Sequence, residues 1–314
     1  MVSQPQHSAR HTVPVAAPAG VVYGLLADAP RWPVLLPWFV HVERVDFDGA
    51  RDSLMLWYLH EGQVRSARAR RRLHPGERRI DFEVTEPLLP GPPTHGSWNV
   101  SPEDGGRCLL TLRQERPAGP GPAPGALGAQ VREQLAAVRE AAERWERWDE
   151  LLLSFEDSVH VLGSPEIVYD FLYRIADWAD LVPHVERAEV GEDRPGVQRA
   201  VLHTSDPGSG DTSVVEVVRL CFPAAGRIVH QQTAGPGLLA AHYGEWSLEP
   251  DARGVRVVRT HQVMLRESAL EPALGAGAQP VDARRHVREW LGRTGTETLT
   301  LARWHAESAL RRLR

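Results

Sequence analysis

The sequence predicts an α+β fold of two tandem domains, in each of which a curved antiparallel sheet wraps around a long C-terminal helix and leaves an internal cavity. Three observations predict this fold. The chain has 314 residues, more than one hydrophobic core usually organises. The sequence repeats itself once along its length. Within each copy the pattern reads as a strand, short helical segments, six strands and one long helix, which is typical of an α+β domain.

The repeat is visible residue by residue. Positions near the start of the first copy recur 146 residues later, as Val13, Val15, Tyr23 and Trp32 do in Val159, Val161, Tyr169 and Trp178. Further along, the spacing is 148, where Arg71 matches Arg219, Trp98 matches Trp246 and Gln114 matches Gln262. Such self-similarity indicates duplication of a complete folding unit. We therefore expect a flexible tail over residues 1–10, a first domain over 11–150 and a second over 151–314.

The elements of the first copy follow from periodicity and turn residues. A strand over residues 12–15 precedes helical segments that begin at Pro18, which suits a first helical turn, and close at Trp32-Pro33, near Leu36. Six strands of a meander follow, separated by glycine-containing turns, over residues 42–46, 53–59, 64–73, 79–85, 96–100 and 108–115. Apolar residues at helical spacing then predict a helix from Gly128 to about Leu153.

Composition excludes several classes of function. The chain contains no lysine, which removes phosphate loops of the Walker type, Schiff-base nucleophiles and pyridoxal-phosphate anchors. Its net charge of -5 argues against a nucleic-acid partner, although the arginines within residues 65–79 fit an acidic protein or a solvated strand face. The 14 histidines lack metal-ligand spacing, so we expect neither a metal nor a cofactor.

The two cysteines and the hydropathy pattern indicate the compartment. Cys108 and Cys221 form no CxxC motif or disulfide framework. The sequence contains no run of about 18 apolar residues that could cross a bilayer, and residues 1–20 lack the apolar core of a signal peptide. We expect a cytoplasmic protein that does not contact the membrane.

Strand alternation identifies candidate catalytic residues. In residues 67–73, Arg71 is the lone charge on the face that carries Ala67 and Ala69. The same operation places Gln114 on the apolar face of its strand. The second copy repeats both positions as Arg219, beside Val217, and Gln262, beside Val258.

A buried arginine requires a carboxylate, a wet pocket or a ligand oxygen. One interpretation is a structural ion pair with the C-terminal helix. The other is a guanidinium that donates to a ketone and stabilises the enolate or alkoxide that develops there, with the glutamine holding a neighbouring carbonyl or water. Trp32, Trp98, Trp178 and Trp246 fit either an aromatic pocket wall or core anchors.

These residues lie within a wider pattern. The chain resembles the di-domain aromatase/cyclases of bacterial type II polyketide synthases, which have the START-like helix-grip fold. The resemblance spans residues 11–314 and is carried by residues 13–18 (VPVAAP), 28–33 (DAPRWP), 176–178 (ADW), 181–185 (LVPHV), 218–223 (VRLCFP) and 281–288 (VDARRHVR).

The resemblance implies an activity. The family closes the first ring of a poly-β-ketone by an aldol reaction and dehydrates it to an aromatic ring, as an aromatase/cyclase without a cofactor. The implied partners are an acyl carrier protein, whose phosphopantetheine holds the chain, and other type II synthase subunits. Di-domain members usually receive ketoreduced chains.

The resemblance also implies site residues. Arg71 matches a strand arginine that orients and polarises the polyketide, and Gln114 matches a pocket glutamine or histidine. Leu36 and Phe39 are further candidates for pocket-lining residues, and Phe39 stands where the family can have a tyrosine. A non-catalytic carrier of a polyketide or lipid, or a scaffold subunit of the synthase, remains the alternative, because fold alone does not determine function.

Overall fold

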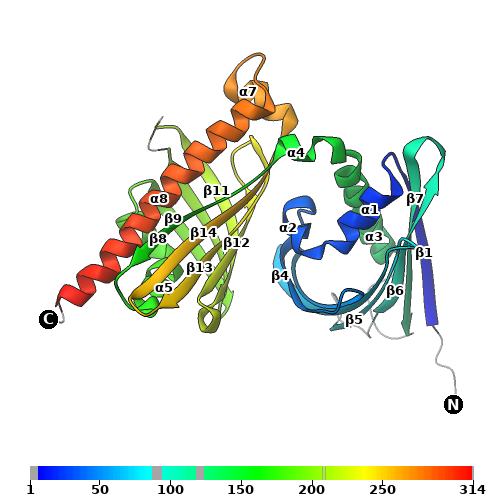
Figure 1. The fold of residues 1–314 in the computed structure, drawn as a ribbon, viewed down its shortest axis with the longest axis horizontal. Helices are drawn as coiled ribbons and strands as arrows, with labels where there is room; N and C mark the ends of the chain where they lie inside the picture. Colours follow the sequence, from blue (N-terminus) through cyan, green and yellow to red (C-terminus); the bar gives the residue numbers. More distant parts are fainter. Residues whose placement is uncertain (1–5, 87–93, 118–123, 207, 209, 313–314) are drawn as a thin grey trace. The chain divides into compact units, whose positions relative to one another are not determined.

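The computed structural model describes residues 6–86, 94–117, 124–206, 208 and 210–312. It divides the chain into two compact units, Met1–Trp148 and Asp149–Arg314, whose boundary lies two residues from the expected one. Each unit holds a seven-stranded antiparallel sheet with a long helix at its C-terminal end (Figure 1). The predicted α+β helix-grip fold is confirmed.

The first unit follows the predicted order. Its strands are β1 (Gln6–Val15), β2 (Phe39–Phe47), β3 (Arg51–His60), β4 (Gln63–His74), β5 (Arg79–Glu86), β6 (Thr94–Glu103) and β7 (Arg107–Pro117). Its helices are α1 (Ala19–Ala27), α2 (Trp32–Leu35) and α3 (Pro124–Glu143), and α4 (Trp148–Leu151) begins at its last residue and continues into the second unit. The sheet order is β1-β7-β6-β5-β4-β3-β2, so the meander is closed at one edge by the first strand.

Three expectations about this unit need correction. The tail expected over residues 1–10 is strand from Gln6 onward, because β1 pairs with β7 from Gln6 to Val15. The dipeptide Trp32-Pro33 opens the short helix α2, since proline occupies one of its first helical positions. The long helix ends at Glu143, and Leu152 begins the first strand of the second unit.

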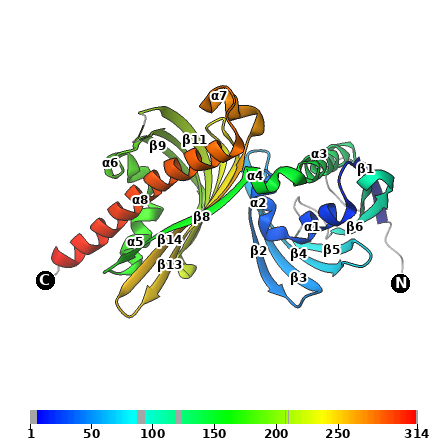
Figure 2. The same ribbon diagram turned by 45° about the horizontal axis from the view of Figure 1, so that its top comes forward.

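The second unit repeats the arrangement. Its strands are β8 (Leu152–Val161), β9 (Val185–Arg194), β10 (Val197–Ser205), β11 (Thr212–Phe222), β12 (Arg227–Ala234), β13 (Leu239–Asp251) and β14 (Gly254–Leu265). Its helices are α5 (Pro165–Tyr173), α6 (Trp178–Leu181), α7 (Leu270–Leu274) and α8 (Pro280–Arg312). Figure 2 shows α8 running along the sheet of its own unit. Ser164 caps the N-terminus of α5 through a hydrogen bond from the Glu166 amide.

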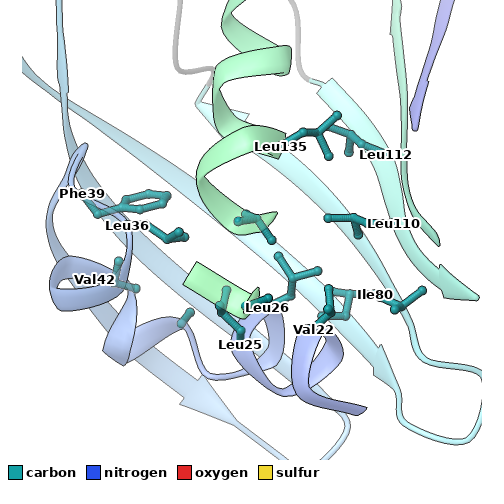
Figure 3. Packing of buried hydrophobic residues seen from close by; sticks show 14 of the residues in the cluster. Val22, Leu25, Leu26, Leu36, Phe39, Val42, Ile80, Leu110, Leu112 and Leu135 are labelled. Atoms are coloured by element: carbon teal, nitrogen blue, oxygen red, sulfur yellow. The ribbon is translucent and has the colours of Figure 1, made fainter. Parts of the chain in front are cut away.

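The core of each unit lies between sheet and helices. In the first, Leu110 and Leu112 of β7 face Leu135 of α3 (Figure 3), and both strand residues are fully buried. The second unit has one cluster around α5 and the C-terminal half of α8 and another around α7. None of the helices in the described part of the chain is long and apolar enough to span a membrane.

Candidate functional site

One row of residues crosses the inner face of each sheet, and the two rows correspond. In the first unit the strand register aligns Asp52, Arg71, Phe82, Gly96 and Gln114. In the second it aligns Gln198, Arg219, His230, Gly244, His261 and Phe155. The two sheets thus have corresponding rows of positions, but several of these positions carry different side chains.

Arg71 caps the C-terminal end of α1 and links it to the sheet. Its Nε and Nη2 donate to the Asp52 carboxylate, with an Nε–Oδ1 distance of 2.8 Å. Its Nη1 donates to the Leu26 carbonyl at 2.7 Å, and Nη2 also donates to the Ala27 carbonyl at 2.9 Å. These two carbonyls are at the C-terminal end of α1, where backbone acceptors have no partner within the helix. The ion-pair partner is therefore a neighbouring strand rather than the C-terminal helix.

Trp32 completes this cap. Its Nε1 donates to the Leu25 carbonyl at 2.9 Å, and the Arg71 guanidinium lies 5.3 Å from the centre of its ring. Three successive carbonyls of α1 are thus satisfied by two side chains. An aromatic ring beneath a guanidinium adds cation–π attraction.

The second unit builds the same cap with one substitution. Arg219 donates to the Leu172 and Tyr173 carbonyls at the end of α5, and Trp178 Nε1 donates to the Phe171 carbonyl at 3.1 Å. Where Arg71 meets a carboxylate, Arg219 meets the neutral Gln198 Oε1 at 2.6 Å. Burial lowers the pKa of the Arg219 guanidinium.

The structure corrects the assignment of Gln262. The turn before β7 spans residues 104–106, whereas the turn before β14 spans only 252–253, so the repeat spacing falls from 148 to 147. A one-residue slip moves every side chain to the other face of a strand. His261, which is fully buried, therefore occupies the place of Gln114, and Gln262 lies on the opposite face, next to Ser154.

A glycine opposite each inward residue leaves room for a ring. A Cβ at Gly244 would lie 2.5 Å from His230 Cε1 and 2.6 Å from the Thr260 carbonyl. A Cβ at Gly96 would collide with the ring of Phe82 in the same way. The ring of Phe82 thus lies over β6 at Gly96, and the ring of His230 lies over β13 at Gly244.

The inner face of the second unit gathers a polar cluster that the sequence did not predict. His242 Nε2 and His261 Nδ1 are 3.0 Å apart, and the His230 and His242 rings meet edge to face at 5.4 Å between centroids. The Arg259 guanidinium lies 4.6 Å from the centre of the Trp246 ring. All three histidines are nearly inaccessible to solvent.

Burial determines the charge state of this cluster. It lowers the pKa of His242 to about 3, with the Arg259 charge acting in the same direction. Burial, together with the neighbouring His242 and Arg259, holds the pKa values of His230 and His261 well below the usual range, and burial lowers the pKa of Arg259 to about 10. The cluster therefore combines neutral imidazoles with one guanidinium.

Two atoms of the cluster are buried without a hydrogen-bond partner, His261 Nε2 and Arg259 Nε. The hydroxyl of Tyr169, on α5, is a third such atom. Buried polar groups are almost always satisfied, so these atoms mark where an interior water or ligand would bind. The residues described include no group of three or more His, Cys, Asp or Glu side chains arranged to hold a metal.

The other expected residues are placed as follows. Gln114 is half-buried on the same face as Leu112. Leu36 and Phe39 are buried, and Phe39 contacts Trp32 with ring centroids 4.8 Å apart. Trp98 packs beside Phe82. Like Trp32 it packs against the core of the first unit, whereas Trp178 and Trp246 are part of the core of the second.

The chain is similar to known proteins over both units. Residues 15–141 match a family described as polyketide cyclase/dehydrase and lipid transport, and residues 153–293 match a second profile of the same description. The granaticin polyketide synthase bifunctional cyclase/dehydratase of Streptomyces violaceoruber is 31% identical over 98% of this chain and 95% of its own length. The corresponding actinorhodin protein of Streptomyces coelicolor is 31% identical over 94% of this chain and 95% of its own length.

Two solved structures are similar to the chain over both of its units. The di-domain aromatase/cyclase StfQ of the steffimycin pathway superposes with a TM-score of 0.85 at 29% identity, covering 96% of this chain and 99% of its own. BexL of the BE-7585A pathway gives 0.84 at 32% identity with the same coverage. These similarities extend over nearly the full length of each protein.

Proposed function

The chain belongs to the polyketide cyclase/dehydrase and lipid transport family, and on that premise we propose that it is an aromatase/cyclase of polyketide biosynthesis that closes the first ring of a carrier-bound, ketoreduced poly-β-ketone and dehydrates it. The observation that supports this proposal most directly is the match of both units to a bifunctional cyclase/dehydratase along 98% of the chain.

The chemistry needs a chain held in one bend, an enolisable methylene and donors near the ketone. The apolar walls around Leu110 and Leu112 suit the first requirement. Gln114 in the first unit and His261 in the second are the polar groups on the inner faces that we assign to contact with substrate. Arg71 and Arg219 act as positioning residues, because protein oxygens already occupy their guanidinium groups.

The outer face of the first sheet supports a carrier protein as partner. One row crosses it from β3 to β1 as Arg51, Arg72, Asp81, Ser97, Arg113 and Arg10. The register places Arg51 beside Arg72 and Arg113 beside Arg10, and like charges so placed are destabilising. The four arginines are exposed and make no side-chain hydrogen bond or ion pair within the described residues.

This row fits an acidic helix. Asp81 lies beside Arg72 in the register and also pairs with Arg79 and His74, so one carboxylate faces several cationic groups. Neighbouring strands are about 4.8 Å apart, and three such spacings separate Arg72 on β4 from Arg113 on β7. The distance is roughly 14 Å, or just under three helical turns. We propose that an acidic helix of the acyl carrier protein docks here. Binding of the carrier protein should weaken in Arg72→Glu and depend on salt, whereas Arg187→Glu in the second unit should leave it unchanged.

The experiment that tests the function is reconstitution of a minimal polyketide synthase and a ketoreductase with and without this protein. Products are identified by mass spectrometry and NMR. A new aromatic first ring supports the proposal. An unchanged product profile contradicts it and favours a carrier or scaffold subunit.

A further inference from the structure

Inside the second unit, two neighbouring side chains, His261 and Arg259, each have a buried nitrogen without a hydrogen-bond partner. The Arg259 side chain and His261 Nε2 lie near the position that a Cβ on Gly295 of α8 would take: that point is 3.2 Å from Arg259 Nη1, 3.5 Å from Arg259 Cδ and 3.8 Å from His261 Nε2. A Cβ there would be in tight contact with the guanidinium, so the glycine leaves room for about one atom beside the two polar side chains.

Hydrogen bonds determine which proton each imidazole carries. Gln232 presents its Oε1 to His242 Nδ1 at 3.3 Å, and a carbonyl oxygen only accepts. His242 is therefore protonated at Nδ1, and its Nε2 accepts from His261 Nδ1. A neutral imidazole carries one proton, so the lone pair of His261 lies on Nε2, the atom without a partner.

The Arg259 side chain can donate a hydrogen bond where His261 can accept one. Its Nε is a buried donor without a partner, and its guanidinium is held over the Trp246 ring. A ligand atom between the two groups must donate to His261 and accept from Arg259. One hydroxyl oxygen does both, whereas a ketone cannot donate and a carboxylate would face the imidazole lone pair.

A series of side-chain contacts runs from His261 towards the surface of the unit. Phe155 stacks on His261 at 4.6 Å between centroids, and Arg288 of α8 lies 4.4 Å over Phe155 while pairing with Asp157. Asp157, Arg288 and Gly292 line a hollow of about 800 Å³ along α8. Gly292 lies about one helical turn before Gly295 on α8.

We infer that His261 and Arg259 form a binding site for a ligand hydroxyl in the second unit, with a neutral hydroxylated polyketide or phenol as the ligand class. The inference rests on the proposed function for the identity of the ligand, but the hydroxyl preference follows from the donor and acceptor alone. The second unit would then bind a chain that carries an alcohol or a phenol, such as an aldol product.

The test compares two probes that differ in one proton, 1-naphthol and 1-methoxynaphthalene, by calorimetric titration of the full chain. A hydrogen bond is worth about 0.5–1.5 kcal/mol, so wild type should prefer naphthol by roughly twofold to tenfold. His261→Phe keeps the stacking on Phe155 and should abolish the preference. Gly295→Ala should do the same by filling the space.

The control is His160→Phe on the exposed side of β8, where the imidazole pairs with Asp251. It should keep the preference for naphthol. Equal binding of both probes to wild type, or a preference that persists in His261→Phe, would overturn the inference and indicate that the space holds water only. Thermal unfolding checks that each variant is folded. Because binding is measured without turnover, this result is independent of the product profile that tests the proposed function.

Discussion

Replacement of Asp52 by alanine should destabilise the first unit strongly. The Asp52 side chain is inaccessible to solvent and that of Arg71 is 4% exposed. The substitution leaves the guanidinium buried with only the two α1 carbonyls as acceptors. Removal of one partner from a buried pair costs about 3–5 kcal/mol. For a domain of this size we expect the midpoint of thermal unfolding to fall by roughly 6–20 °C.

Differential scanning calorimetry of the full chain measures this effect, with two matched variants for comparison. Gln198→Ala removes the corresponding acceptor of Arg219 in the second unit and should cost about 1.5–3 kcal/mol, the value of a hydrogen bond to a charged group. Asp81→Ala removes a half-exposed carboxylate from β5 and should cost less than about 1 kcal/mol. If Asp52→Ala shifts unfolding no more than Asp81→Ala, the cap does not hold α1 to the sheet.

Three further outcomes are expected. Gly244→Ala should destabilise the second unit by about 1–3 kcal/mol, because its Cβ would overlap the His230 ring, and calorimetry would show no shift if the strands relax freely. Burial lowers the pKa of His242 from 6.5 to about 3. The contribution of this residue to stability is therefore present above pH 6.5 and is lost as the pH falls towards 3, by up to about 1.4 kcal/mol per pH unit. Urea unfolding of His242→Gln should show a shallower pH dependence of the free energy of unfolding than the wild type. Ser164→Ala removes the α5 cap and should cost about 0.5–2 kcal/mol in the same assay.

The repeat and the strand alternation were sufficient to predict the fold and the inward position of Arg71. They did not predict its partner. Asp52 precedes Arg71 by 19 residues and reaches it only because β3 and β4 pair in one particular register. Pairing between strands depends on turn lengths and packing, which a pattern of alternation along one strand does not contain.

The histidine cluster escaped prediction for a related reason. His230, His242 and His261 lie on three different strands and carry no motif spacing. Alignment of the copies at a fixed spacing of 148 pointed to Gln262 instead. The signal that was available is the turn before β14, shorter by one residue, together with alternation of Val255, Val257 and His261 on one face.

Comparison of the two rows separates framework from ligand chemistry. The arginine, the tryptophan beneath it and the glycine across the sheet occur in both units, and each makes a contact that the fold requires: the helix cap in the first two cases and space for a ring in the third. Asp52 and Gln198 also differ, but each accepts a hydrogen bond from the arginine of its row. The other two positions that differ, Phe82 against His230 and Gln114 against His261, lie on the inner faces and take no part in the helix cap. Since one scaffold tolerates both sets, the differences are free to serve binding. The geometry therefore favours two interiors with separate tasks, an apolar one that bends the chain and a polar one that receives a hydroxyl.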